Sequence, residues 1–407
     1  MPRAIVAGGS IGGLSAALAL RESGFEVTVH ERAGATLGNR GAGIVAHEES
    51  LRRLTREGGL RLDDLSIPSR SLRYFDRAGR LAHEEPSSYR FTSWHTLHSA
   101  LLALAGEGCY RWGSALQGFA QDEQQDAVTA WFSDGSTQRA DLLVGADGIT
   151  STARGILLPG TSPRYAGYVG WRGIVPTAEA GPDLFEALGH DITYQLLEPG
   201  HILAYPIPGG SRAAPAASAR YLNWVWYRNV AEGGELDRLR TDATGMAREL
   251  SVPPGAVAPG HVAEMRSAAS RLHGALRALV LATREPFIQV VVDLEVPRMA
   301  FGRVCLLGDA AFVARPHAAA GTAKAAADAR RLGEVVRGRH GDHGNAGAGI
   351  TAALADYERT QLPLGRALVR RARALGHAVQ FEGPWQPGDP QLLFGLRRPG
   401  DSAFPAR

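Results

Sequence analysis

Cysteine is scarce in this sequence, with only Cys109 and Cys305 among 407 residues. Their spacing matches neither a zinc site nor a redox pair, which favours a reducing compartment, and we expect a cytoplasmic location. No apolar run reaches the ~18 residues that a membrane helix needs. The chain also enters a predicted strand at once, which indicates no signal peptide. The sequence therefore excludes a disulfide scaffold and predicts no membrane contact.

An excess of charge of one sign is also lacking. The formal net charge is +3 at pH 7, and the arginines are scattered along the chain rather than gathered in one patch. Such a surface has no electrostatic footprint for nucleic acid, so we expect no nucleic-acid partner. The histidines show no ligand pattern such as H-E-x-x-H, and we expect no metal.

The segment IVAGGSIGGLSAALALRESGFEVTVHER near the start is the first informative pattern. Residues 3–7 are apolar and predict a buried parallel strand, and the stripe in 11–23 predicts a helix that ends at Gly24. The free N–H groups of such a helix bind pyrophosphate, and an acid about 20 residues on binds a ribose hydroxyl. The pattern predicts a dinucleotide site with contacts from Gly8, Ser10, Gly12, Gly13, Glu31 and Arg32. Ser10 replaces the usual middle glycine and is small enough for the backbone to approach the phosphates.

The character of the chain changes between 160 and 300, where β-rich, aromatic segments such as RYLNWVWYRNV are separated by turns. These segments predict an antiparallel sheet in a second domain, as expected for a chain of this length. The predicted dinucleotide-binding domain comprises 1–75, 91–158 and 302–345. The predicted sheet domain comprises 76–90 and 159–301, followed by a helical segment, 346–380, and a tail, 381–407.

Two further segments follow in order, DLLVGADGITSTAR at 141–154 and GRVCLLGDAAFVARPHAAAGTAKAAADARRL at 302–332. With the first segment, they resemble the class A FAD-dependent aromatic hydroxylases, the para-hydroxybenzoate hydroxylase family. The resemblance covers residues 1 to about 380. It implies an α/β fold: a Rossmann-like FAD-binding domain of the glutathione-reductase type, a mostly antiparallel β-sheet substrate domain and a long C-terminal helix.

The resemblance also assigns residues to FAD. Asp309 would hydrogen-bond the ribityl chain, and Pro316 would lie beside the flavin ring. A helix that begins with Gly321, Thr322 and Ala323 would direct its N–H groups at the pyrimidine edge of the reduced, anionic flavin. The other positions that match family motifs are Asp147 with Gly148, Arg154 and Arg40.

Three departures from the family pattern affect single contacts. Phe312 stands where the family commonly has histidine, and Ala-Ala-Gly-Thr-Ala at 319–323 replaces Gly-Gln-Gly-x-Asn. Trp94 and His95 stand where an arginine often contacts the pyrophosphate.

The family resemblance implies a reaction as well. NAD(P)H would reduce FAD, O₂ would add to give a flavin hydroperoxide, and an electron-rich ring, ionised at its own hydroxyl, would be hydroxylated. The segments GAGIV, RFTS, YAGYV, AYPIPG, NVAEG and RPHAAAG are similar to family members that act on hydroxylated pyridines. We therefore predict a monooxygenase for a hydroxypyridine-like ring, from which the protein must exclude water.

Aromatic and imidazole side chains are the candidates for substrate contact. Tyr194, Tyr205 and Trp224 lie on neighbouring predicted strands, where ordinary core packing is an equally good explanation for each. His47 and His317 could each take a proton near neutral pH, or have a structural role only. We predict catalytic roles for His47, His317 and Tyr205, and substrate contacts from Tyr194, Tyr205, Trp224, His47 and Pro316.

Other functions stay open at this point. The same chemistry could act on a larger hydroxypyridine or a phenolic biosynthetic intermediate, or the chain could bind flavin without turnover. A plain NAD-dependent dehydrogenase would not need the GD segment, and the W-x-W-x-I-P motif of flavin halogenases is absent. The sequence does not decide between NADH and NADPH, and a homodimer is only a family expectation.

Overall fold

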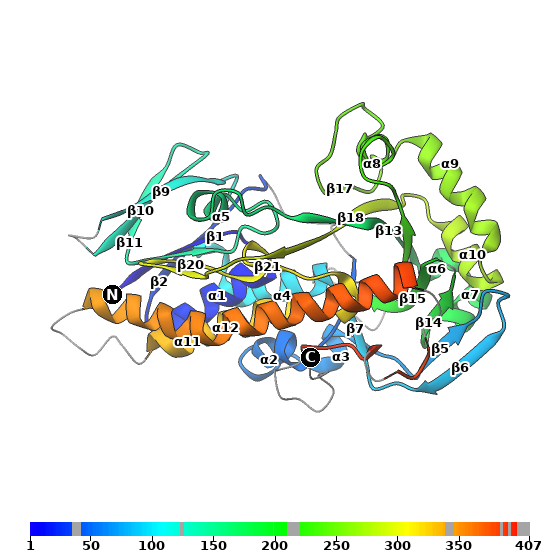
Figure 1. Ribbon diagram of the computed structural model, residues 1–407. Coiled ribbons are helices and arrows are strands. Elements are labelled where there is room, and N and C mark those ends of the chain that lie inside the picture. Colours follow the sequence, from blue (N-terminus) through cyan, green and yellow to red (C-terminus); the bar gives the residue numbers. More distant parts are fainter. Residues whose placement is uncertain are drawn as a thin grey trace.

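The structure, a computed structural model, describes residues 1–34, 42–122, 126–197, 199–209, 220–337, 346–382, 386–389 and 392–396. Figure 1 shows an elongated molecule with two main sheets arranged end to end. Helix α12 (Ala346–His377) runs along much of the molecule and spans from one sheet towards the other (Figure 1). Arg40 lies outside the described residues, so its predicted FAD contact has no structural counterpart.

The first sheet brings together the three motif segments. Its strand order is β19-β20-β12-β1-β2-β8, and every pairing except that of β19 is parallel. Ala4 pairs with both Val27 and Leu142, and Leu143 pairs with Val304. The strands are β1 (Arg3–Ala7), β2 (Glu26–Glu31), β8 (Tyr110–Trp112), β12 (Leu142–Gly145), β19 (Ala300–Phe301) and β20 (Val304–Leu306). Because β1, β12 and β20 are parallel neighbours, the turns after them meet at one edge of the sheet.

Helices with small apolar residues cover this sheet. Helix α1 buries Leu14, Ala16, Ala17 and Leu20 in the same hydrophobic cluster as the strand residues. Gly333 of α11 faces Ala19, where a Cβ atom would meet the Ala19 carbonyl at 3.0 Å, so the two helices pack closely. The helices of this region are α1 (Ile11–Glu22), α2 (Glu48–Arg56), α3 (Leu62–Leu65), α4 (Trp94–Ala105), α5 (Thr152–Leu157) and α11 (Gly321–Arg337).

The second sheet is largely antiparallel, with the order β17-β18-β13-β16-β15-β14-β5-β6 and with β21 paired to β18. Its strands are β5 (Ser71–Phe75), β6 (Leu81–Pro86), β13 (Arg164–Pro176), β14 (Ile192–Leu196), β15 (His201–Pro208), β16 (Arg220–Asn229), β17 (Ser251–Val252), β18 (Phe287–Glu295) and β21 (Phe312–Val313). Strand β5 lies in the range 1–75 that we predicted for the first domain. Its parallel pairing with β14 places it in the second sheet, because the β-rich stretch begins at 71 rather than at 76.

The two faces of the second sheet bury different clusters. One face packs on α7 (Pro182–Leu188), α9 (Pro259–Ala268) and α10 (Gly274–Ala282), with Trp224 and Trp226 in that cluster. The other face carries Tyr194, Tyr205 and Tyr227. Adjacent residues of a strand point to opposite faces, so this alternation decides which aromatics face the first domain.

Smaller elements complete the described chain. Two further sheets comprise β9 (Leu116–Asp122), β10 (Ala127–Phe132) and β11 (Thr137–Ala140), and β3 (Gly43–Val45), β4 (Ile67–Pro68) and β7 (Arg90–Ser93). The remaining helices are α6 (Thr177–Ala180) and α8 (Gly234–Arg240). The short 3-10 turns are η1 (Glu107–Cys109), η2 (Ala269–Arg271), η3 (Gly308–Ala310) and η4 (Pro316–Ala318), and a π-helical turn, η5 (Ala378–Glu382), follows α12.

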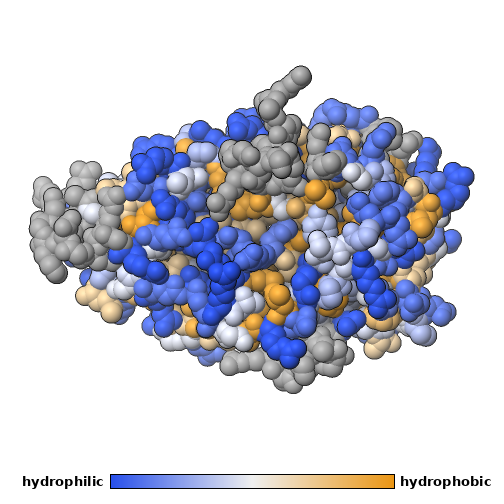
Figure 2. Space-filling model, turned by 90° about the horizontal axis from the view of Figure 1, so that it is seen from below, coloured by the Kyte–Doolittle hydropathy of each residue, from blue (hydrophilic) through white to orange (hydrophobic). Residues whose placement is uncertain are grey.

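On the face seen from below, hydrophilic residues predominate and hydrophobic residues form patches among them (Figure 2). In the part of the chain that the structure describes, no helix combines the length and the apolar character needed to cross a bilayer.

Candidate active site

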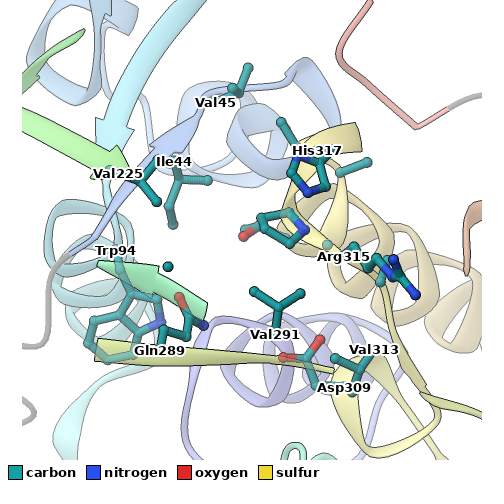
Figure 3. A pocket seen from close by; sticks show the side chains of 18 of the residues that line it. Ile44, Val45, Trp94, Val225, Gln289, Val291, Asp309, Val313, Arg315 and His317 are labelled. Atoms are coloured by element: carbon teal, nitrogen blue, oxygen red, sulfur yellow. The ribbon is translucent and has the colours of Figure 1, made fainter. Parts of the chain in front are cut away.

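A cavity of about 360 Å³ lies between the two sheets. The turns after β1, β12 and β20 form one part of its wall, and β13, β15, β16 and β18 form another. Figure 3 shows Ile44, Val225 and Trp94 on one side of the open space, and Arg315, Val313 and Asp309 on the other. The structure thus brings the dinucleotide turn and the aromatic face of the second sheet to a single cavity.

The predicted FAD contacts divide into two groups. Those that line the cavity are Ser10, Gly12, Asp309, Pro316, Gly321 and Thr322. Those that are not part of the lining are Gly8, Gly13, Glu31, Arg32, Asp147 and Ala323. The second group supports the wall, as its hydrogen bonds and close approaches show.

Close backbone approach shapes the turn after β1. Gly8 has φ +106°, and a Cβ atom on it would meet the Ala146 carbonyl oxygen at 2.2 Å. The buried Glu31 accepts the N–H groups of Gly9 and Ala33, each at 2.9 Å. The carboxylate that we predicted for a ribose hydroxyl therefore also fixes the turn, and Arg32 donates to Thr150 at 3.0 Å.

Trp94 occupies the place of the missing family arginine. Its indole N–H lies 3.3 Å from the Ser10 hydroxyl, and both residues line the cavity. The pair offers neutral hydrogen-bond donors beside the α1 N-terminus in place of a guanidinium.

The second and third motifs are joined by Arg154, which is buried. Its guanidinium donates to the carbonyl groups of Ile149 (2.6 Å) and Ala310 (3.0 Å), one on each turn. Asp147 accepts the hydroxyl of Ser151 and the N–H of Ala153, so it caps α5 beside the cavity. Burial raises the pKa of Asp147. Asp147 therefore holds the turn around Gly148, and Gly148 itself lines the cavity.

Asp309 opens into the cavity from the turn after β20. Its surroundings desolvate the carboxylate and raise its pKa to about 6, and the nearby Lys324 ammonium partly offsets this. Lys324 itself is buried and paired with Asp328 at 2.5 Å. A carboxylate held this way accepts hydrogen bonds from hydroxyl groups in the cavity, which suits a ribityl chain.

The loop that follows leads into α11. Pro316 and His317 form a short turn, Ala319 adopts φ +50°, and α11 begins at Gly321. Gly321 and Thr322 at the helix N-terminus face the cavity, whereas Ala323 is fully buried. Free N–H groups at this end favour an anionic partner.

Three of the predicted substrate residues, Tyr194, Tyr205 and Pro316, line the cavity, and Trp224 does not. Tyr194 and Tyr205 lie on the paired strands β14 and β15 and are nearly fully buried in the cavity wall. Trp224 is completely buried on the opposite face, and its indole N–H donates to Thr283 at 2.9 Å. The prediction that Trp224 contacts the substrate is wrong. Tyr205 pairs directly with Asn223, so the next residue must point away.

His47 is also corrected by the structure. It is not part of the cavity lining, and its Nε2 atom lies 2.7 Å from the Ala319 carbonyl oxygen. Burial lowers its pKa. With its Nε2–H donated to a backbone carbonyl, His47 supports the loop around Ala319, and its position outside the lining gives the predicted substrate contact no support.

His317 does line the cavity, and it is embedded in a polar cluster. Its Nε2 atom lies 2.8 Å from the Tyr168 hydroxyl, and its ring centroid lies 5.5 Å from that of His201. Burial lowers the pKa of His317 to about 3, and the Arg315 charge adds to this. The imidazole is therefore neutral over the physiological range.

Arg315 ties this cluster to the rest of the fold. It makes two hydrogen bonds with Asp293 of β18 through Nε and Nη2, the shorter at 2.8 Å, and Arg373 of α12 contacts the same carboxylate at 3.2 Å. The guanidinium also lies over the Tyr168 ring, with 5.6 Å between Cζ and the ring centroid. The position of Tyr168 is therefore fixed from two elements.

Several cavity residues were missed by the sequence reasoning. Arg172 donates to Gln289 at 2.8 Å, and its buried Nε has no hydrogen-bond partner among the described residues. Alternation along β13, β15 and β18 could have pointed to these positions, once the face of each strand was known. The missed lining residues are Trp94, Arg172, His201, Tyr227 and Gln289.

We expect the buried histidines to make the protein sensitive to acid. The pKa values of His317 and His201 lie below the unfolded value, so below pH ~6.5 the unfolded chain binds more protons. Their contribution to stability is complete above that pH and is lost as the pH falls toward 3. For His317, the free energy of unfolding should drop by about 1–2 kcal/mol between pH 7.5 and pH 5.

Urea unfolding of the wild type and of His317→Gln at the two pH values measures this drop. The variant should lose less stability than the wild type on acidification. An identical loss in both proteins would contradict the assignment of a neutral, buried His317.

The residues present fit FAD. Gly8 leaves no room for a side chain where the turns after β1 and β12 touch, so the backbone forms a cradle at the α1 N-terminus. Asp309 supplies an acceptor, and the N-terminus of α11 supplies donors, at the far side of the same cavity. Donors for phosphates, an acceptor for hydroxyls and a positive helix end for an anionic ring match the parts of that cofactor.

Comparisons with known proteins point the same way. Residues 165–293 match a family model described as "FAD binding domain-like". The chain is 40% identical over 395 residues to 2,6-dihydroxypyridine 3-monooxygenase of Paenarthrobacter nicotinovorans, covering 97% of this chain and 96% of that protein. The solved structure of 2,6-dihydroxypyridine-3-hydroxylase from Arthrobacter nicotinovorans superposes with a TM-score of 0.90 at 40% identity, over 98% and 97% of the two chains. Klebsiella pneumoniae HpxO, solved with FAD and uric acid, gives a TM-score of 0.73 at 26% identity, over 96% and 90%.

Proposed function

Because the chain belongs to the class A FAD-dependent aromatic hydroxylases, we propose that it hydroxylates a small hydroxypyridine, with 2,6-dihydroxypyridine as the best candidate. The chain is an FAD-dependent monooxygenase with NADH or NADPH as cosubstrate. The observation that carries the substrate proposal is the polar end of the cavity, where neutral His317 and three tyrosines surround a space suited to one ring. Those tyrosines are Tyr194, Tyr205 and Tyr227, and the buried Tyr168 contacts the Nε2 atom of His317 from outside the lining.

FAD would be held by the three turns described above. Ser10, Gly12 and Trp94 would contact the pyrophosphate, Asp309 the ribityl hydroxyls, and the N-terminus of α11 the ring. When bound, FAD supplies the electrons and the oxygen activation for the reaction. We also infer that the parallel sheet and its helices form a glutathione-reductase-type domain. We infer that the domain division keeps our predicted ranges, except that the sheet domain begins at 71, that β19 (Ala300–Phe301) joins the first sheet and that β21 (Phe312–Val313) joins the second.

His317 would stabilise the ionised substrate. Arginine only donates hydrogen bonds, so the Arg315 charge beside Tyr168 directs the tyrosine proton away from itself and toward Nε2 of His317. A neutral imidazole that accepts at Nε2 carries its proton on Nδ1. We infer that this Nδ1–H donates to the ring hydroxylate and so favours the ionised form. The ionised hydroxyl makes the ring electron-rich. Tyr205 would contact the ring from the sheet, near the Arg172 guanidinium that lowers the cost of negative charge there.

The test is anaerobic reduction of the FAD-bound enzyme by NADH in a stopped-flow instrument, with and without 2,6-dihydroxypyridine. We expect the ligand to accelerate flavin bleaching at least about tenfold, because ligand and cosubstrate sites are coupled by a few kcal/mol in such systems. Pyridine without hydroxyl groups serves as the control and should have no effect. Bleaching that 2,6-dihydroxypyridine leaves unchanged would reject this substrate and direct attention to larger rings.

A further inference from the structure

One part of the cavity wall comes from a segment far along the chain. Leu392 and Phe394 line the cavity together with Leu375 and Val379 of the preceding helical region. Phe394 packs in the cluster that holds Tyr194 and Tyr205, at the substrate end. Segment 392–396 is therefore a wall of the substrate space, although it belongs to neither main sheet.

Backbone hydrogen bonds fix this segment from three directions. The Gly395 N–H donates to the Ala318 carbonyl at 2.9 Å, beside the flavin loop. Arg371 of α12 donates to the carbonyls of Gly395, at 2.8 Å, and Leu393. The Phe394 N–H donates to the Tyr89 hydroxyl at 3.0 Å. These hydrogen bonds use only backbone atoms of the segment, so they stay available when the side chain at 394 is changed.

The Phe394 side chain adds apolar bulk at a defined place. Its ring lies 4.9 Å from the Tyr89 ring, centroid to centroid. Leu393, the residue before it, points outward and is 39% exposed. Phe394 and Leu393 therefore offer a matched pair for substitution, since one side chain lies in the cavity wall and the other in solvent.

Because the cavity is small, the size of the Phe394 side chain decides which substrates fit. A cavity of about 360 Å³ must hold the flavin ring as well as the substrate, and complete ligand sites commonly measure 300–1,000 Å³. A ring with an extended substituent needs space that the Phe394 side chain occupies. We propose that segment 392–396, through Phe394, sets the upper size of the substrate, so that the enzyme accepts a single ring and rejects rings with long substituents. This proposal rests on the proposed hydroxylation of a small hydroxypyridine.

The test compares the FAD-bound wild type, Phe394→Ala and the control Leu393→Ala. The substrates are 2,6-dihydroxypyridine and its 4-propyl derivative. Each reaction is measured by NADH oxidation and by mass analysis of the product. We expect Phe394→Ala to raise kcat/KM for the 4-propyl derivative, relative to kcat/KM for 2,6-dihydroxypyridine, at least about tenfold, because one methylene group too many in an apolar pocket already costs about 10–200-fold. Leu393→Ala should leave the ratio unchanged, and an unchanged ratio in Phe394→Ala would overturn the proposal.

A second readout is independent of substrate identity. Iodide quenching of the bound flavin's fluorescence should increase in Phe394→Ala and in Arg371→Met, which frees two carbonyls of the segment, and not in Leu393→Ala. Increased quenching without turnover of either dihydroxypyridine would support segment 392–396 as the cover of the site and reject the proposed substrate. Equal quenching in all four proteins would overturn the role of the segment.

Discussion

Replacing Gly8 by alanine should yield a protein that purifies without flavin. The new Cβ would lie 2.2 Å from the Ala146 carbonyl oxygen and 2.9 Å from Cα of Asp147, both backbone atoms that cannot rotate away. The turns after β1 and β12 must then move apart, and both belong to the FAD site. A displacement of about 1 Å in such a site costs on the order of 100-fold, so we expect FAD affinity to fall at least that much.

Gly24→Ala is the matched control. Gly24 has φ +89°, close to the +106° of Gly8, yet a Cβ atom there would meet nothing within 4 Å. The control carries the cost of a left-handed alanine, about 1–2 kcal/mol, without the collision. Titration of each apoprotein with FAD, followed by fluorescence, measures the difference. Equal affinities for the two variants would show that the close approach at Gly8 does not matter.

Turnover should fall about 100-fold in His317→Phe, because the variant loses the donor that stabilises the substrate's negative charge. The substrate would then ionise less readily in the site. The acid limb of the kcat/KM profile should therefore move to higher pH by about one unit, which corresponds to about 1.4 kcal/mol. Steady-state kinetics between pH 5 and pH 9 would record both effects.

Two variants separate this role from a structural one. His317→Gln retains an amide donor and should recover part of the turnover and of the pH profile. Tyr168→Phe leaves His317 in place but removes the hydroxyl at 2.8 Å that fixes its tautomer, and should lower turnover by about tenfold. If His317→Phe kept its turnover and pH profile, His317 would have no part in binding the ionised ring.

Local patterns predicted the elements that form the cofactor side of the cavity. The strand, turn and helix of residues 3–23 are specified by glycines and apolar periodicity within a short stretch. The Asp309 turn matches the family motif, and Gly321 at the start of α11 is retained although its neighbours depart from that motif; both positions reach the cavity. The family and the monooxygenase activity are confirmed by relatives that cover nearly the whole chain.

The substrate side depended on information that is not local. Trp224 and Tyr205 are equally aromatic, and only the register of β15 against β16 decides which one faces the cavity. His47 follows GAGIV as expected, but its contact with Ala319 arises from a loop that is 272 residues away in sequence. Phe394 lies in a stretch rich in Gly and Pro with no period, so no pattern could assign it to the wall.

The strands β1, β12 and β20 are neighbours in space but far apart in the sequence, which also bears on how the protein is made. Ala4 pairs with Leu142, and Leu143 in turn with Val304, so the central sheet is completed only when most of the chain has left the ribosome. Until then the β1–α1–β2 unit presents open strand edges, which favour aggregation. We therefore expect the cofactor to bind only at the end of translation, and chaperones to bind the nascent chain before that.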